Sequence, residues 1–109
     1  MATVYKVLGQ SNPAATTNTT LYTVPASTSA VVSTITICNQ ASSAATYRIA
    51  VRPAGAAAAA QHWIVYGATV AGSDSTALTL GLTLATTDII TIYASTSTLS
   101  FAAFGSEIS

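Results

Sequence analysis

Charge is the scarcest property of this 109-residue chain. Only 6% of its residues are charged, against about 25% in an average soluble domain. The charged residues are Lys6, Arg48, Arg52, Asp74, Asp88 and Glu107. They cancel to a net charge of zero, and no block of basic residues is present to neutralise phosphates. We therefore expect no nucleic-acid binding and no attachment to a membrane surface through a basic amphipathic helix.

Cysteine and long apolar segments are also scarce. Cys38 is the only cysteine, which excludes a disulfide within the chain. Its position at the end of an apolar run predicts a buried, unreactive thiol. No apolar run approaches the roughly 20 residues that a membrane-spanning helix needs. Residues 1–6 lack the continuous apolar core of a signal peptide, so we expect synthesis in a cytoplasm without export by that route.

Few side chains are suited to catalysis or to metal binding. One histidine, one cysteine and three acids lie in separate segments, whereas catalysis needs titratable groups held close together. His62 and Cys38 are the only soft metal ligands, and a zinc site needs three or four ligands. The six glycines are isolated and form no phosphate-binding loop. We therefore predict no catalytic residue, no metal site and no cofactor, and we expect the protein not to be an enzyme.

What the chain has in abundance is alternation of apolar and polar residues. Val, Ile, Thr and Tyr recur with a period of two, which is the side-chain period of a β-strand. Leu78, Leu80, Leu82 and Leu84 show this period most clearly, since helical packing needs a spacing of three to four. The pattern predicts eight strands, over residues 3–8, 20–24, 30–38, 45–51, 61–66, 75–80, 88–94 and 99–104.

Turn-forming residues separate the predicted strands. Pro53 and Gly67 are each expected to end a strand, and residues 10–19 predict a long loop. The alanine-rich residues 54–60 predict a loop with at most one helical turn, because isolated helices so short are marginal in water. Alternating strands bury their apolar faces only when two sheets cover each other. We therefore predict one all-β domain over residues 1–109, a two-sheet β-sandwich or jelly roll of about eight short strands.

The more apolar face of each strand predicts the core. The residues expected there are Val31, Ile35, Ile37, Tyr47, Ile49, Val51, Leu78, Leu80, Ile90, Ile92, Leu99 and Phe101. In the strand over residues 88–94, Ile90 and Ile92 are preferred to Ile89 and Tyr93. Trp63 is expected to pack in the core rather than to supply contact area in an interface.

A smaller set of residues is expected to contact partner subunits. A net charge of zero favours association. With so few charges, the polar surface must come from Ser and Thr, which supply 32 of the residues. Arg48 and Arg52 share one face of a strand, either as solvated charges at a sheet edge or as anchors for carboxylates of a neighbour. Phe101 and Phe104 point to opposite faces, so Phe101 can fill the core while Phe104 meets a partner. The candidate interface residues are Tyr5, Lys6, Arg48, Arg52, His62, Tyr66 and Phe104.

Three segments resemble a known class of proteins. They are Leu21-Tyr-Thr-Val-Pro-Ala, residues 31–39 followed by Thr46-Tyr-Arg-Ile-Ala-Val-Arg-Pro, and Thr98-Leu-Ser-Phe-Ala-Ala-Phe-Gly-Ser-Glu-Ile. Together they resemble small Ala/Ser/Thr-rich virion structural proteins of tailed bacteriophages. Some proteins of this class are capsid cement or decoration proteins, and others are attached to tails or fibres. The resemblance covers nearly the full chain and implies no catalytic residues.

Given this resemblance, we expect a capsid cement protein located in the virion. It would form a homotrimer and bind the major capsid protein or another virion protein at subunit junctions. The loop over residues 10–19 is long enough to let the first strand reach a neighbouring subunit as an arm. The first alternative is a tail, baseplate or fibre component. A carbohydrate-binding module, with Trp63 or Tyr66 against the sugar, is a further alternative, and a small hydrolase is the last.

Overall fold

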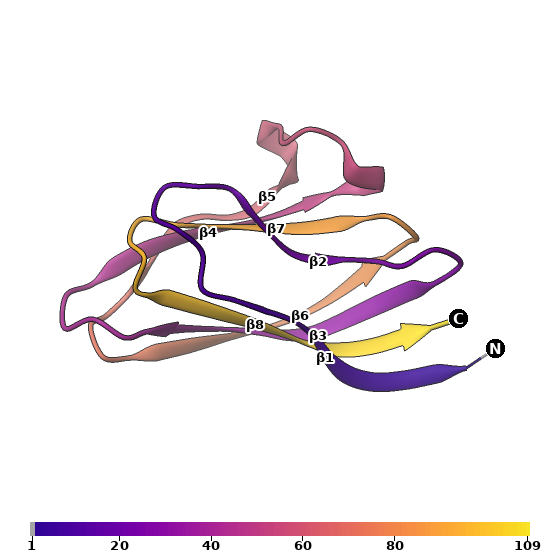
Figure 1. Ribbon diagram of the computed structural model, residues 1–109, viewed down its shortest axis with the longest axis horizontal. Helices are drawn as coiled ribbons and strands as arrows, with labels where there is room; N and C mark the ends of the chain where they lie inside the picture. Colours follow the sequence, from indigo (N-terminus) through magenta and orange to yellow (C-terminus); the bar gives the residue numbers. More distant parts are fainter. Residues whose placement is uncertain (1) are drawn as a thin grey trace.

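The computed structural model describes residues 2–109, which form two antiparallel four-stranded sheets packed face to face (Figure 1). In chain order the strands are β1 (Thr3–Ser11), β2 (Thr19–Thr23), β3 (Ser29–Asn39), β4 (Ala45–Arg52), β5 (Trp63–Val70), β6 (Ser75–Leu84), β7 (Ile89–Ala94) and β8 (Leu99–Ile108). Two single turns of 3₁₀ helix, η1 (Pro53–Gly55) and η2 (Ala60–His62), lie between β4 and β5. The predicted all-β fold of eight strands is confirmed.

The strand order is that of a jelly roll. The first sheet has the order β1-β8-β3-β6, and the second sheet has the order β2-β7-β4-β5. β1 pairs with β8, β2 with β7, β3 with β6 and β4 with β5, so the two halves of the chain pair in reverse order. This pairing decides between the two architectures that the sequence left open. It also brings the termini together, where Ala2 and Ser109 exchange two backbone hydrogen bonds of 2.7 and 2.9 Å.

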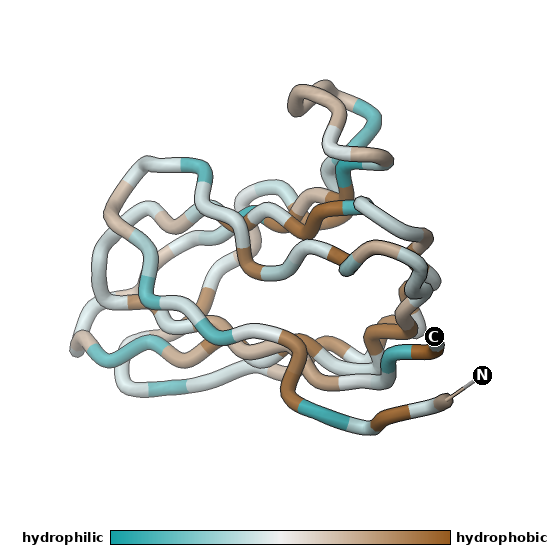
Figure 2. The backbone as a smooth tube through the Cα atoms, turned by 45° about the vertical axis from the view of Figure 1, so that its right-hand side comes forward, coloured by the Kyte–Doolittle hydropathy of each residue, from teal (hydrophilic) through white to brown (hydrophobic). Residues whose placement is uncertain are grey.

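The core lies between the two sheets. Figure 2 shows the two layers of strands, with hydrophobic residues recurring along them. The predicted core residues that are buried there are Ile35, Ile37, Tyr47, Ile49, Ile90, Ile92, Leu99 and Phe101. Tyr47 of the second sheet packs edge to face against Phe101 of the first, with ring centres 6.2 Å apart. The preference for Ile90 and Ile92 on β7 is confirmed.

Strict alternation places Val31 in the core, and this prediction is wrong. Val31 is half-exposed on the outer face of the first sheet, whereas Val32 is completely buried. The cause is a β-bulge, because Ser33 is an extra residue of β3 between the pairs that Val32 and Thr34 form with β8. An extra residue reverses the direction of the side chains beyond it, so Val32 takes the inward position that alternation assigns to Val31.

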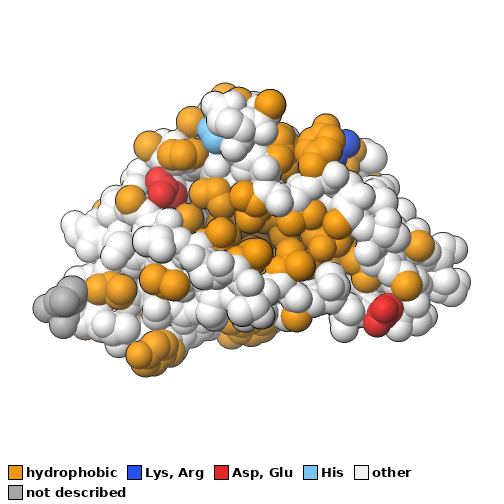
Figure 3. Space-filling model, turned by 180° about the vertical axis from the view of Figure 1, so that it is seen from behind, with side chains coloured by type: hydrophobic (Ala, Val, Ile, Leu, Met, Phe, Trp, Pro, Cys, Tyr) orange, Lys and Arg blue, Asp and Glu red, His pale blue; other side chains and the backbone are white. Residues whose placement is uncertain are grey.

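The sandwich is less completely closed along β5 and β6, which are edge strands of the two sheets. Val51, Leu78 and Leu80, all predicted in the core, face it but are only half-buried. Figure 3 views the molecule from behind and shows hydrophobic side chains gathered in a band on this side. The half-buried residues that pack against the core are Val51, Val65, Ala68, Leu78, Leu80 and Leu82. The predicted burial fails here because no further strand within residues 2–109 covers the margin between the two edge strands.

Several strands continue past their predicted ends. β1, β5, β6 and β8 extend to Ser11, Val70, Leu84 and Ile108. Gly67 and Gly81 lie inside β5 and β6 with φ values of +86° and +68°, near shifts in the strand pairing. A glycine adopts such a conformation without steric cost, so a strand can continue through it.

The first strand belongs to the first sheet in this structure. β1 pairs with β8 of the same chain over its whole length, from Thr3 to Ser11. The loop that follows is anchored, because the Asn12 side chain donates hydrogen bonds of 2.9 and 2.8 Å to the carbonyl oxygens of Ser97 and Leu99. A contact with a neighbouring subunit would therefore use the exposed surface of β1 rather than a free arm.

Candidate functional site

The seven candidate interface residues do not form one surface. Two lie on the outer face of the first sheet, four lie over the outer face of the second sheet, and one lies at the margin between the sheets. In that order they are Tyr5 and Phe104; Arg48, Arg52, His62 and Tyr66; and Lys6. The structure therefore presents two separate candidate surfaces.

On the outer face of the first sheet, apolar side chains gather over β1, β8 and β3. We call Tyr5, Val7, Val31 and Phe104 the β1 patch. Val7 lies opposite Phe104 in the β1–β8 pairing, and Tyr5 and Val7 are 84% and 47% exposed. The four residues line a shallow depression of about 540 Å³. Phe101 is buried while Phe104 lies on this outer face, so their predicted placement on opposite faces is confirmed, and contact of Phe104 with a partner stays a prediction.

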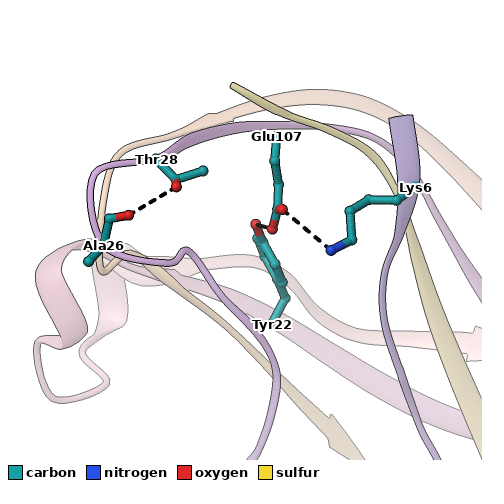
Figure 4. Close-up of polar contacts among 5 residues, drawn as sticks. All are labelled: Lys6, Tyr22, Ala26, Thr28 and Glu107. Atoms are coloured by element: carbon teal, nitrogen blue, oxygen red, sulfur yellow. Dashed lines mark hydrogen bonds and ion pairs between the residues drawn. The ribbon is translucent and has the colours of Figure 1, made fainter. Parts of the chain in front are cut away.

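Lys6 also lines this depression, but its ammonium is engaged by Glu107 of β8. Its ammonium donates to Glu107 Oε1 at 3.4 Å, and the Tyr22 hydroxyl donates to Oε2 at 2.6 Å (Figure 4). The bond from Tyr22 and then the contact with Lys6 lower the pKa of Glu107. Burial and then the bonded carboxylate raise the pKa of Tyr22. These residues join β2 of the second sheet to β1 and β8 of the first, which is a structural role.

On the second sheet, two aromatic rings enclose the guanidinium of Arg48. The guanidinium carbon lies 4.2 Å from the ring centre of Tyr66 and 4.2 Å from that of Tyr93. Trp63 meets Tyr66 edge to face, with ring centres 5.5 Å apart. Such cation–π contacts stabilise by about 0.5–1 kcal/mol at exposed sites. Because β4 is an interior strand, the interpretation of Arg48 as a solvated charge at a sheet edge is wrong.

Trp63 lies on the outer face of the second sheet, and its predicted place in the core is wrong. Val65 pairs with Ile49 and Trp63 pairs with the next residue of β4, so Ile64 is an extra residue in β5. This bulge turns Val65 inward and both Trp63 and Tyr66 outward. Trp63 is half-buried there.

Residues 53–62, which we call the Ala loop, fold over the outer face of the second sheet. Arg52 holds this loop: its Nε donates to Thr91 Oγ1 and its Nη1 donates to the carbonyl oxygen of Ala56, both at 2.9 Å. Thr91 points away from the core but is only 3% exposed. The loop contains two short 3₁₀ turns, one at each end, where the sequence predicts at most one turn.

Asp88 and His62 fix the ends of the Ala loop. The Asp88 carboxylate accepts hydrogen bonds of 2.8 Å from the N–H groups of Ala54 and Ala85. The Nδ1 atom of His62 accepts a hydrogen bond of 3.1 Å from the N–H group of Ala59. These side chains are thus engaged in shaping the loop.

Between the Ala loop and the aromatic rings lies a pocket of about 650 Å³, which we call the loop pocket. The residues that line it are Asn18, Ala58, Ala59, Ala60, Trp63 and Tyr66. A smaller hollow of about 310 Å³ shares Asn18 and Ala58 with it and reaches Arg52 and Thr91. Sequence reasoning named Tyr66 but missed Asn18, because nothing in a loop sequence shows which distant strand it will approach.

Cys38 is exposed, so the prediction of a buried thiol is wrong. After the bulge in β3, Ile37 points inward and Cys38 points to the outer face. Among residues 2–109, no three His, Cys, Asp or Glu side chains are grouped to hold a metal ion. The same part of the chain contains no helix with the length and apolar character needed to cross a membrane.

Comparisons of the chain with protein-family models, curated proteins and solved structures find no match. The two surfaces are therefore interpreted from their own chemistry. The β1 patch is apolar, and the loop pocket combines aromatic rings with an amide and backbone groups.

Proposed function

We propose that the chain is a virion structural protein of a tailed bacteriophage, of the capsid cement type. It binds as a homotrimer at junctions between capsid subunits and stabilises the head. The observation that carries the proposal is the exposed apolar surface of β1. Tyr5 and Val7 are 84% and 47% exposed on the outer face, where they line one depression with Val31 and Phe104. Val4 is 51% exposed, but it points to the other face of this edge strand. Contiguous exposed apolar surface of this kind is typical of sites that bind other proteins.

Apart from the bulge at Leu8, the β1 edge of the first sheet has few features that would prevent pairing with another chain. Proteins usually protect edge strands with lysine or proline. Lys6 is the only lysine, and it is engaged by Glu107. Pro13 and Pro25 lie beyond the ends of β1 and β2. Subunits of a particle that cover this edge would prevent it from pairing with other chains.

Threefold symmetry is supported by the resemblance to cement proteins rather than by the β1 patch. Any closed ring would cover the patch equally well. Because apolar contacts carry little charge, assembly should depend weakly on salt.

The proposal is tested by placing a charge in the patch. Tyr5→Glu should give a monomer that no longer binds particles lacking the protein, because burying an unpaired carboxylate opposes association. Sedimentation velocity measures the oligomer, and co-sedimentation with particles measures binding. Substitution is preferred to deletion of β1, which would also remove the pairing with β8.

Ala77→Glu is the matched control, since it adds the same charge at an exposed position of β6 in the same sheet. This variant should assemble and bind particles like the unmodified chain. An unmodified chain that stays monomeric at high concentration and fails to bind particles would refute the proposal. Binding to isolated tails but not to heads would replace the cement role with that of a tail component.

A further inference from the structure

The loop pocket is an open hollow with the volume of a small-ligand site. Its volume of about 650 Å³ lies within the range of about 300–1,000 Å³ that ligand pockets occupy. It is lined by two aromatic residues, Trp63 and Tyr66, and by the alanines at positions 58–60. The pocket lies on the sheet opposite the β1 patch, so the capsid contact proposed above does not explain it.

The side chain of Tyr66 is exposed to solvent, but its ring is held in place by its neighbours. Its side chain is 64% exposed, yet its ring lies against the Arg48 guanidinium and against Trp63. An aromatic ring held in this way loses little conformational entropy when a ligand packs on it. The Arg48 guanidinium is itself held between two rings, which keeps the arrangement in place without a ligand.

Asn18 supplies free polar groups at the mouth of the pocket. Its side chain is exposed, and no hydrogen bond within residues 2–109 engages its amide. A carboxamide both donates and accepts, as a ligand hydroxyl does. The backbone N–H and C=O groups of Ala58 can also donate to and accept from a ligand, because they make no hydrogen bond to another part of the described chain.

The lining of the loop pocket contains no charged side chain among the described residues. Arg52 borders the adjoining hollow, but its guanidinium is engaged by Thr91 and Ala56. An anionic or cationic ligand would therefore lose its hydration without gaining an ion pair. The site fits a neutral ligand with both apolar and hydroxyl-bearing faces.

We infer that the loop pocket binds a neutral sugar ring of a glycan. One face of a pyranose presents C–H groups that pack on an aromatic plane, and its rim presents hydroxyl groups. Because the planes of Trp63 and Tyr66 are 74° apart, the C–H face packs on one ring while the other ring borders the sugar, and ring hydroxyls exchange hydrogen bonds with Asn18 and the backbone of Ala58. The protein can thus hold a particle through the β1 patch while it presents a glycan site on the opposite sheet.

Trp63 is the only tryptophan, so its fluorescence reports directly on the pocket. Titration with maltoheptaose, cellohexaose, chitohexaose and mannohexaose should give a saturable change for at least one sugar. Tyr66→Ala and Asn18→Ala should each weaken that binding by about tenfold or more, whereas Tyr66→Phe retains the ring and should retain binding. The dissociation constant should be the same in about 50 and 500 mM salt, since no ion pair forms.

Tyr5→Ala is the matched control, because it removes an exposed tyrosine from the opposite sheet and should leave sugar binding unchanged. Thermal melts establish that each variant is folded before binding is compared. The inference is overturned if none of the four sugars gives a saturable signal, or if folded Tyr66→Ala and Asn18→Ala bind like the unmodified chain. A salt-sensitive preference for heparin over these sugars would also overturn it. None of these results bears on particle binding, which is measured separately.

Discussion

Val31 and Val32 are neighbours on β3, yet only Val32 contributes to the core. Val32→Ala should lower the free energy of unfolding by about 2 kcal/mol, because it leaves a cavity between the sheets. Val31→Ala, on the outer face, should change it by less than about 0.5 kcal/mol. Urea denaturation of both variants measures the difference, with Ile49→Ala as a reference at about 2–5 kcal/mol. The opposite order for the two valines would contradict the bulge at Ser33.

Glu107 makes stability depend on pH. Its pKa is lower in the folded protein than its ordinary value of 4.5, so the carboxylate stabilises the fold at neutral pH. This stabilisation is lost as the pH falls below about 4.5 through the folded-state value. Glu107→Gln should therefore lower the Tm at pH 7 and have little effect near pH 2. Lys6→Gln should have a smaller effect at pH 7, since the bond from Tyr22 contributes more to the shift.

Thermal melts of Glu107→Gln and the unmodified chain across this range provide the measurement. A loss of Tm that stays the same down to pH 2 would show that the ionised carboxylate is not the cause. The loss of Tm would then reflect only the altered shape of the side chain.

At the scale of elements, two bulges flank β8 at the level of Phe104. Leu8 is the extra residue of β1 on one side, and Ser33 is the extra residue of β3 on the other. Bulges bend the strands that contain them, and the end of the first sheet curves where β1 and β8 approach the termini (Figure 1). The β1 patch lies on this bent part of the sheet.

Gly105 and Gly81 are expected to differ in their tolerance of a side chain. A Cβ at Gly105 would overlap the carbonyl oxygen of Val31 on the adjacent strand, so Gly105→Ala should cost about 3 kcal/mol or more. Gly81→Ala meets no atom within 4 Å but keeps a positive φ of +68°, and should cost about 1–2 kcal/mol. Gly81→Asn should cost less, because asparagine tolerates this conformation better. Chemical denaturation gives all three values, and a Gly105→Ala variant as stable as Gly81→Ala would contradict the close approach of β8 to β3.

At the scale of the whole molecule, the jelly roll places the two surfaces on opposite sheets. The β1 patch is built on β1, β8 and β3, and the loop pocket is built over the second sheet by the Ala loop and β5. A partner on one sheet therefore leaves the other accessible. The half-open margin between β5 and β6 is a third apolar region (Figure 3).

The sequence by itself determined the strands, their approximate positions and most of the core. Side-chain alternation is a local property, and it identified Ile35, Ile49 and Phe101 as buried and Phe104 as outward. Low charge is likewise a property of the composition, and the expectation of partner contacts was based on it. Of the two candidate surfaces, Tyr5, Phe104 and Tyr66 were predicted from this local pattern.

Only the tertiary structure decided the rest. A bulge exists relative to a partner strand, so the outward positions of Val31 and Trp63 depend on how β3 and β5 pair. The loop pocket unites Asn18 with residues 58–66, and this contact arises because the chain pairs its two halves in reverse order. Alternation records the direction of each side chain within its own strand, whereas pairing and closure are set by residues far apart in the sequence.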